Sequence, residues 1–320
     1  MKTLVQRILT ALGRGFIDFV SKPASPRPLA VLRIGVAGIL LVQAFLLAGS
    51  LLDLYGERAF VQWSALPKGP PPELVSAGWL REMLGVGGDT SVQVVFYAYV
   101  GCLVLLLCGW QTRIAAIVAW LTHMAIKTTG HAAIYGVDEF AHIALFYCVW
   151  MPVGNDLSLD KQQGRRSDEP TALARLALRV LQLHLCVVYL SSGIEKGFGT
   201  GSQWWDGEAI WRSVMRPDLA MFDMTWMAEY PWVPTLIGWV TLAVELGYGV
   251  MIWSRWTRPI WAALTIGMHL GIVVVLGLWT FGALMIALNV AALLVSPEPP
   301  PPAPVKAEGK KVKAARLASV

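Results

Sequence analysis

The chain has 320 residues, of which 56% are hydrophobic and only 15% are charged. Soluble domains contain about 25% charged residues, so this composition excludes an ordinary soluble enzyme and indicates an integral membrane protein. The formal net charge is +5. The basic residues gather in a few segments between and beyond apolar stretches. We interpret this distribution as the charge asymmetry of a membrane protein, so we expect no nucleic-acid partner.

The two ends of the chain differ from its middle. Residues 1–27 predict a basic amphipathic helix at the inner membrane surface, because Leu4, Ile8 and Leu12 fall on one side of it. Such a helix lies on an anionic leaflet with its apolar side buried. Residues 297–320 hold a proline run and then basic residues without aromatics. This composition predicts a disordered cytoplasmic tail.

Residues 28–296 predict one all-α membrane domain, a polytopic helical bundle with about eight transmembrane helices. A bilayer core about 30 Å thick needs about 20 apolar residues per helix. The eight candidate segments are 28–52, 91–109, 113–127, 138–153, 172–195, 234–253, 258–276 and 278–296. The third and fourth are short and contain charged residues and histidines, which predicts that they are tilted, broken or packed against their neighbours.

The distribution of lysine and arginine predicts the orientation. These residues are concentrated in the N-terminal segment, in 154–171 and in the C-terminal tail, whereas the long loops 53–90 and 196–233 carry most of the acidic residues. Cytoplasmic segments are enriched in lysine and arginine. We therefore expect both termini in the cytoplasm, both long loops outside, and a multi-pass location in a bacterial-type inner or plasma membrane.

Polar residues follow two stripes of the fifth predicted helix. Gln182, Tyr189 and Lys196 are seven residues apart and share a face, while His184 and Glu195 belong to another. A lysine at a helix end can extend to water, or it can be desolvated, which favours the neutral amine that acts as a base. Glu195 is either its ion-pair partner or points away from it.

A second polar cluster lies at the outer end of the fourth predicted helix. It contains His131, Asp138, Glu139 and His142. The spacing from Glu139 to His142 is that of half a di-iron site. Since the sequence has no second Glu-x-x-His, we predict no metal and favour a polar pocket.

Three further polar residues interrupt the last apolar segments, namely Glu245, His269 and Asn289. Polar residues are costly at lipid-facing positions, so several in one bundle predict a polar cavity. The sequence lacks the glycine-rich nucleotide motifs, the serine hydrolase motif and the HExxH zinc motif, which leaves those activities without support.

The run at 181–211 resembles the signature of the HTTM membrane family, to which the vitamin K-dependent gamma-glutamyl carboxylase belongs. The matching positions are Gln182, Tyr189, Gly193, Lys196, Trp205 and Gly207. The resemblance implies that Lys196 is a weak base that acts on reduced vitamin K or another quinol. It also implies that His131 is the assisting histidine, although Gly130 stands where the family has asparagine. The chain resembles a short form without the lumenal C-terminal domain, which implies a small secreted peptide as substrate.

Two functions follow as hypotheses. The first is a carboxylase-like membrane enzyme, a lyase that modifies peptides, with Lys196 as base in an outward-facing pocket. The second is a non-catalytic transporter subunit or partner protein, in which the lysine and the acidic residues bind an anion or close ion pairs between helices. An unrelated quinone-binding redox subunit is a third reading.

Overall fold

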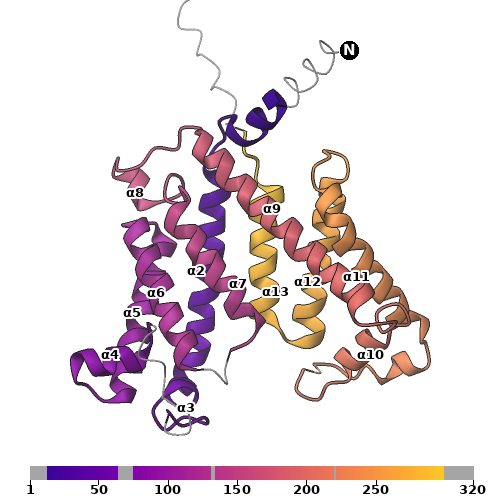
Figure 1. The fold of residues 1–320 in the computed structure, drawn as a ribbon, viewed down its shortest axis with the longest axis horizontal. Coiled ribbons are helices and arrows are strands. Elements are labelled where there is room, and N and C mark those ends of the chain that lie inside the picture. The colour runs from indigo at the N-terminus through magenta and orange to yellow at the C-terminus, as the bar shows by residue number, and fades with distance from the viewer. Residues whose placement is uncertain (1–12, 64–74, 131–133, 220, 299–320) are drawn as a thin grey trace, which may run out of the picture.

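The computed structural model describes residues 13–63, 75–130, 134–219 and 221–298 (Figure 1). These residues form helices joined by loops, without a named strand in the described part. The principal helices are α2 (Arg27–Leu47), α3 (Leu51–Tyr55), α4 (Ala77–Leu84), α5 (Gly88–Cys108), α6 (Thr112–Thr129), α7 (Gly136–Trp150), α8 (Leu159–Gln162), α9 (Ala172–Ile194), α10 (Glu208–Val214), α11 (Trp232–Met251), α12 (Arg258–Leu276) and α13 (Trp279–Asn289).

All eight predicted segments are helical, as α2, α5, α6, α7, α9, α11, α12 and α13. Five stretches of the described chain are long and apolar enough to cross a bilayer: Arg27–Tyr55, Gly88–Cys108, Ala172–Gly199, Trp232–Met251 and Arg258–Leu276. The all-α membrane fold is thereby confirmed. The count of eight spans and the cytoplasmic termini stay predictions, because α6, α7 and Trp279–Leu294 are not among these five stretches.

The long helices run between two ends of the molecule (Figure 1). The N-terminal segment, α8 and the turn between α11 and α12 lie at one end, which we call the inner end. The short helices α3, α4 and α10 lie at the other, the outer end. At the inner end, Ala24 forms a backbone bridge with Thr171, and the amide of Ser25 donates to Pro297 O at 2.8 Å. These contacts join three segments that the charge pattern assigns to one side of the membrane.

The predicted terminal segments are described only in part. Residues 13–21 are helical. Residues 1–12 and the tail from residue 299 lie outside the described residues.

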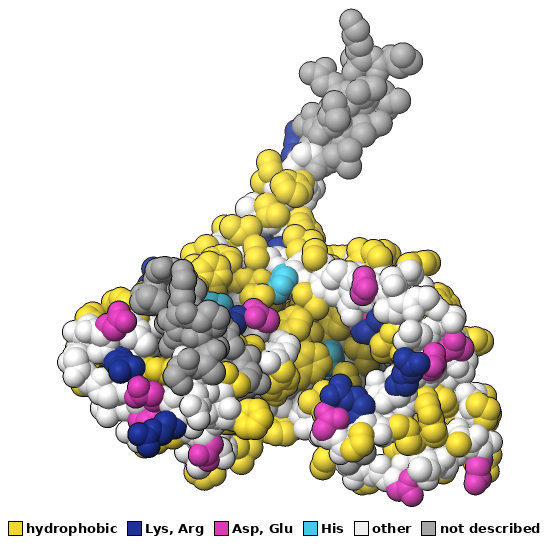
Figure 2. Space-filling view, turned by 60° about the horizontal axis from the view of Figure 1, so that its bottom comes forward, with side chains coloured by type: hydrophobic (Ala, Val, Ile, Leu, Met, Phe, Trp, Pro, Cys, Tyr) yellow, Lys and Arg dark blue, Asp and Glu magenta, His cyan; other side chains and the backbone are white. Residues whose placement is uncertain are grey.

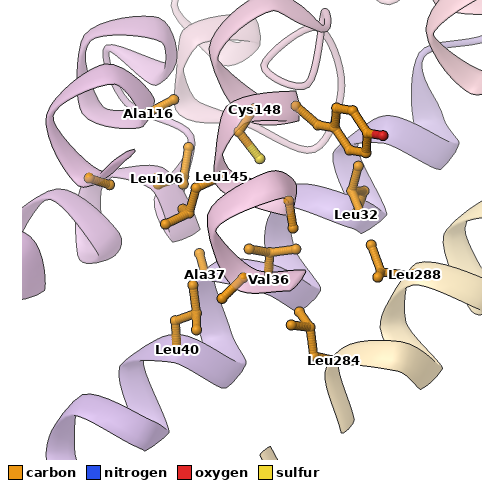
Figure 3. Close-up of a cluster of buried hydrophobic side chains, with 14 of the residues drawn as sticks. Leu32, Val36, Ala37, Leu40, Leu106, Ala116, Leu145, Cys148, Leu284 and Leu288 are labelled. Atoms are coloured by element: carbon orange, nitrogen blue, oxygen red, sulfur yellow. The ribbon is translucent and has the colours of Figure 1, made fainter. Parts of the chain in front are cut away.

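The core is an apolar layer between α2, α5, α7 and α13 (Figure 3). Leu32, Val36 and Leu40 of α2 are buried against Leu145 of α7 and Leu284 of α13. Their spacing of four residues places the three α2 side chains on one face. α9 leaves this layer, runs obliquely across the molecule and pairs with α11 (Figure 1).

A buried arginine fixes the inner end of the first helices. Arg33 is fully buried, and its guanidinium donates to Val153 O at 3.1 Å, Leu107 O at 2.8 Å, Leu157 O at 2.6 Å and also Leu106 O. The last carbonyls of a helix have no partner within the helix. Arg33 supplies donors for those of α5 and holds the loop after α7 against them.

Candidate functional site

The candidate site begins where α9 changes its winding. After Ile194 the chain continues as a π-helical turn, η3 (Glu195–Gly199), closed by a hydrogen bond from Thr200 N to Glu195 O at 3.1 Å. Turns of this kind are rare and are frequent at functional sites. The wider turn leaves Glu195 exposed and directs Lys196 toward α11.

Lys196 is held by a carboxylate from another helix. Its Nζ donates to Oε1 of Glu245 at 2.5 Å and to Oγ of Ser192 at 2.8 Å. It also lies 5.0 Å from the ring centroid of Trp204, at cation–π distance. The Lys196 side chain is 24% exposed, whereas that of Glu245 is only 4% exposed. Glu245, and not Glu195, is the ion-pair partner of Lys196 among the described residues.

A glycine brings these two helices together. A Cβ atom on Gly193 would lie 3.0 Å from Leu246 Cδ2 and 3.1 Å from Glu245 Cβ. Such distances are tighter than ordinary van der Waals contact, so the absence of a side chain lets α9 approach α11 closely. Glu245 reaches Lys196 because of this approach.

A hydrogen-bonded chain of polar side chains ends at His269. The Oη atom of Tyr248 donates to Asn289 Oδ1 at 2.7 Å, and Asn289 Nδ2 donates to Met285 O and to Tyr189 Oη, each at 2.8 Å. Tyr189 lies 2.7 Å from His269 Nε2. The Tyr189 hydroxyl oxygen accepts from Asn289, which leaves its proton available for Nε2. With the proton of Tyr189 on this bond, a neutral His269 would carry its own proton on Nδ1.

Lys196 and Glu245 line one large cavity in the outer half of the molecule, together with Tyr189 and His269. Its volume is about 1200 Å³, and its walls come mostly from apolar side chains of α9, α11 and α12. Figure 2, which brings the outer end forward, shows a hollow lined by hydrophobic side chains between two lobes. The polar residues on the wall include Tyr189, Ser192, Glu195, Lys196, Glu245 and His269.

Two buried polar atoms on this wall lack partners among the described residues. They are Oε2 of Glu245 and Nδ1 of His269, and both residues are 3% exposed. Buried polar groups are normally hydrogen-bonded, and an exception calls for an explanation such as a bound molecule. Both residues line the cavity, so a ligand there would lie beside these two atoms.

The rest of the predicted site lies elsewhere. Asp138 accepts a hydrogen bond from the backbone of Tyr135 at 3.0 Å, and Glu139 pairs with Lys127 at 2.6 Å. The Nδ1 atom of His142 lies 3.4 Å from Nδ1 of His123. The described residues contain no group of three or more metal-ligating side chains. Neither Asp138 nor His142 lines the cavity.

Gln182 also lies off the cavity wall. Gln182 donates to Ala292 O at 2.7 Å and accepts from Arg179 at 2.8 Å, nearer the inner end. Gln182 and Lys196 therefore lie in two different environments, although they were predicted to share a helical face. The reason is that α9 is long and packs against different helices along its length. His131 lies outside the described residues.

Three residues of the site were not singled out by the sequence. Ser192 lies one turn before Lys196, and Tyr248 lies three residues after Glu245, so helical spacing from the predicted residues could have identified both. Trp204 carried no such signal, because it belongs to the loop after η3 and its position depends on how that loop folds.

Comparison with known proteins gives one match. A sequence model of the HTTM domain matches residues 22–297, which is most of the chain. No protein of curated function and no solved structure gives a match.

Proposed function

This chain belongs to the HTTM family, and on that premise we propose a membrane enzyme in which Lys196 is the base for a ligand in the outer cavity. One observation carries the proposal. The lysine is paired with a buried carboxylate whose second oxygen has no partner, on the wall of an apolar cavity. Ionisable groups inside membrane proteins are costly and mark functional sites.

The surroundings of Lys196 suit a proton acceptor. A neutral amine would take a proton from an acidic O–H group, and the ammonium formed would be stabilised by Glu245, Ser192 and the Trp204 ring. Preorganised groups in a water-poor site stabilise a developing charge more strongly than water does. The proton transfer would leave Lys196 as the cation of the ion pair with Glu245.

The cavity fits an apolar molecule with a polar head. Its volume exceeds the range of about 300–1,000 Å³ that is typical for small-ligand sites. His269 Nδ1–H would donate to an oxygen of the head, and Glu245 Oε2 would accept from a hydroxyl. Reduced vitamin K or another quinol has such hydroxyl groups on an apolar body. When bound, a quinol would supply the reducing electrons that activate oxygen.

The second reactant would be a secreted peptide that reaches the cavity from outside. In this proposal the molecule has eight spans and cytoplasmic termini in a bacterial-type inner or plasma membrane, so the outer end faces away from the cytoplasm. The hollow at the outer end supports this direction of entry (Figure 2). A glutamate side chain near the head of the quinol would be the group that is carboxylated.

A non-catalytic role has one observation in its favour. The ion pair between Lys196 and Glu245 joins α9 to α11, which is what a structural helix–helix contact would do. The two roles differ in what they require. A structural contact needs a positive charge, whereas a base needs an amine that gives up and regains a proton.

The test compares purified wild-type protein with Lys196→Ala and Lys196→Arg. Each is supplied with a reduced naphthoquinone, oxygen, bicarbonate and a glutamate-containing peptide. Quinol consumption and peptide mass are measured. We expect the wild type to consume quinol and to add carbon dioxide to the peptide, and both variants to lose at least about a hundredfold in rate, as expected when a general base is removed.

The matched control is Lys127→Ala. Lys127 is 20% exposed and pairs with Glu139 at 2.6 Å, but it lies off the cavity wall. It should keep its activity. Full activity of Lys196→Arg would overturn the proposal that Lys196 is a base and would support a structural contact. A wild type that neither consumes quinol nor changes the peptide would have the same consequence.

A further inference from the structure

Three arginines gather at the inner end, far from the outer cavity. Arg175 and Arg179 are one helical turn apart on α9, and Arg258 begins α12. Arg179 interacts electrostatically with both of the others. We call Arg175, Arg179 and Arg258 the arginine cluster. Two of them are half-buried and Arg175 is buried, so water screens their mutual repulsion poorly.

The cluster has little negative charge to offset it. Arg179 donates to Phe19 O at 3.0 Å and to Gln182 Oε1 at 2.8 Å, and Arg258 donates to Ile252 O at 2.8 Å. These partners are neutral. Among the described residues the only carboxylate bonded to the cluster is Glu298, at 3.5 Å from Arg175.

Free guanidinium donors remain for an anion. Arg258 uses only its Nε in a described hydrogen bond, so both of its terminal nitrogens are without a described partner. Arg179 likewise has Nη2 without a described partner. Guanidinium groups bind phosphate oxygens through such nitrogens, often in pairs.

Aromatic side chains place the cluster at the membrane surface. The guanidinium of Arg179 lies 4.0 Å from the Phe19 ring and 5.5 Å from the Trp253 ring, and these two rings are 5.3 Å apart. Tryptophan is enriched at the level of the lipid headgroups. Exposed apolar side chains follow on the same segments, namely Phe16, Ile17, Leu176, Val250, Trp256 and Ile260.

We propose that the arginine cluster binds the phosphate headgroup of an anionic phospholipid from the leaflet at the inner end. The free nitrogens of Arg179 and Arg258 would hold the phosphate, and the exposed apolar side chains would contact the acyl chains. Because Arg175 and Arg179 also hold the backbone of Lys22 and Phe19, the lipid would secure the N-terminal helix on α9. This site is independent of the chemistry at Lys196.

The test measures lipids that stay bound to the purified full chain in detergent. The protein is exposed to equal amounts of phosphatidylglycerol and phosphatidylcholine, and native mass spectrometry counts the bound molecules. We expect selective retention of phosphatidylglycerol by the wild type. The variant Arg179→Gln with Arg258→Gln should retain it about tenfold less, because each basic residue contributes to the attraction.

A matched control removes the same charge at the same end. Arg113 and Arg166 are exposed and have no described partner, so Arg113→Gln with Arg166→Gln should keep the lipid. The variant Arg179→Lys with Arg258→Lys retains the charge and should keep most of the bound lipid. This variant separates loss of lipid binding from misfolding. Equal loss in the Arg113 and Arg166 variant, or no preference for phosphatidylglycerol in the wild type, would overturn the site. Inorganic phosphate that displaces the lipid at millimolar concentration would assign the site to free phosphate instead.

Discussion

The hydroxyl of Tyr189 sets the hydrogen-bonding character of the cavity wall, although it forms no ion pair. It accepts from Asn289, so its own proton is available to Nε2 of His269, and this arrangement would make the buried Nδ1 a donor. Without this hydroxyl, the imidazole would choose freely between its two neutral forms. One residue thus decides whether the wall offers a donor or an acceptor to the ligand.

This assignment predicts a difference between Tyr189→Phe and Tyr248→Phe. Each removes a hydroxyl from the same chain of hydrogen bonds, at a cost of about 1 kcal/mol in the free energy of unfolding. Only Tyr189→Phe should change which ring nitrogen of His269 carries the proton. We expect nitrogen NMR of histidine-labelled protein to show His269 protonated at Nδ1 in the wild type and in Tyr248→Phe, and a mixture of forms in Tyr189→Phe.

The His269 signal is identified by its loss in His269→Ala. A wild-type spectrum with the proton on Nε2 would contradict the direction of the hydrogen bonds and would make Nδ1 an acceptor. In that case the ligand would have to present a hydroxyl to both His269 and Glu245.

The sequence identified the ionisable residues of the site but could not pair them. Lys196, Glu245 and His269 stand out because each interrupts an apolar run. Their contacts depend on which faces of α9, α11 and α12 meet, and apolar runs without strong periodicity leave those faces undetermined. Glu195 was the nearest acid along the chain, yet the ion-pair partner of Lys196 is Glu245 of another helix.

At the scale of helices, the contact between α9 and α11 positions the site. Gly193 of α9 lies directly against Leu246 and Glu245 of α11. Small residues at helix interfaces allow backbones in a membrane to approach closely. The ion pair between Lys196 and Glu245 therefore depends on a residue that has no side chain of its own.

We predict that Gly193→Val separates α9 from α11. The added Cβ would meet Leu246 and Glu245, and its two methyl groups would need further space, at a cost of about 1–3 kcal/mol in the free energy of unfolding for overpacking. The control is Gly197→Ala, where the nearest atoms to a new Cβ lie at 3.6 Å and 3.9 Å, within ordinary contact. Thermal unfolding in detergent would show a lower transition temperature for Gly193→Val alone. Equal stability of both variants would mean that α11 shifts without cost.

The helices themselves were predictable because each long apolar run has few alternatives in a bilayer, where backbone groups must bond within the segment. The eight expected segments all became helices, with ends displaced by a few residues. Turns proved harder to predict. The short helix α10 and the π-helical turn η3 follow from packing against α11 and from glycines, and neither carries an apolar run.

At the scale of the whole molecule, the number of spans depends on α6 and α7. A helix of 15 residues, such as α7, is only about 22 Å long, which is shorter than a bilayer core of about 30 Å. The pair still runs from the inner to the outer end (Figure 1). Lys127 and Glu139 form an ion pair where the two helices meet at the outer end, and the Glu139 side chain is 61% exposed.

Eight spans predict that the connection between α6 and α7 is accessible from outside. In a protein whose four cysteines are replaced by alanine, single cysteines at Gly136, Arg166 and Glu229 are treated with a membrane-impermeant maleimide. All three positions are exposed. We expect Gly136→Cys and Glu229→Cys to react in intact cells and Arg166→Cys to react only after permeabilisation, because charge places 154–171 inside. If Gly136→Cys failed to react in intact cells while Glu229→Cys reacted, α6 and α7 would form a hairpin that enters from the inner side. The molecule would then have six spans, but Lys196 and its cavity would keep their outward orientation.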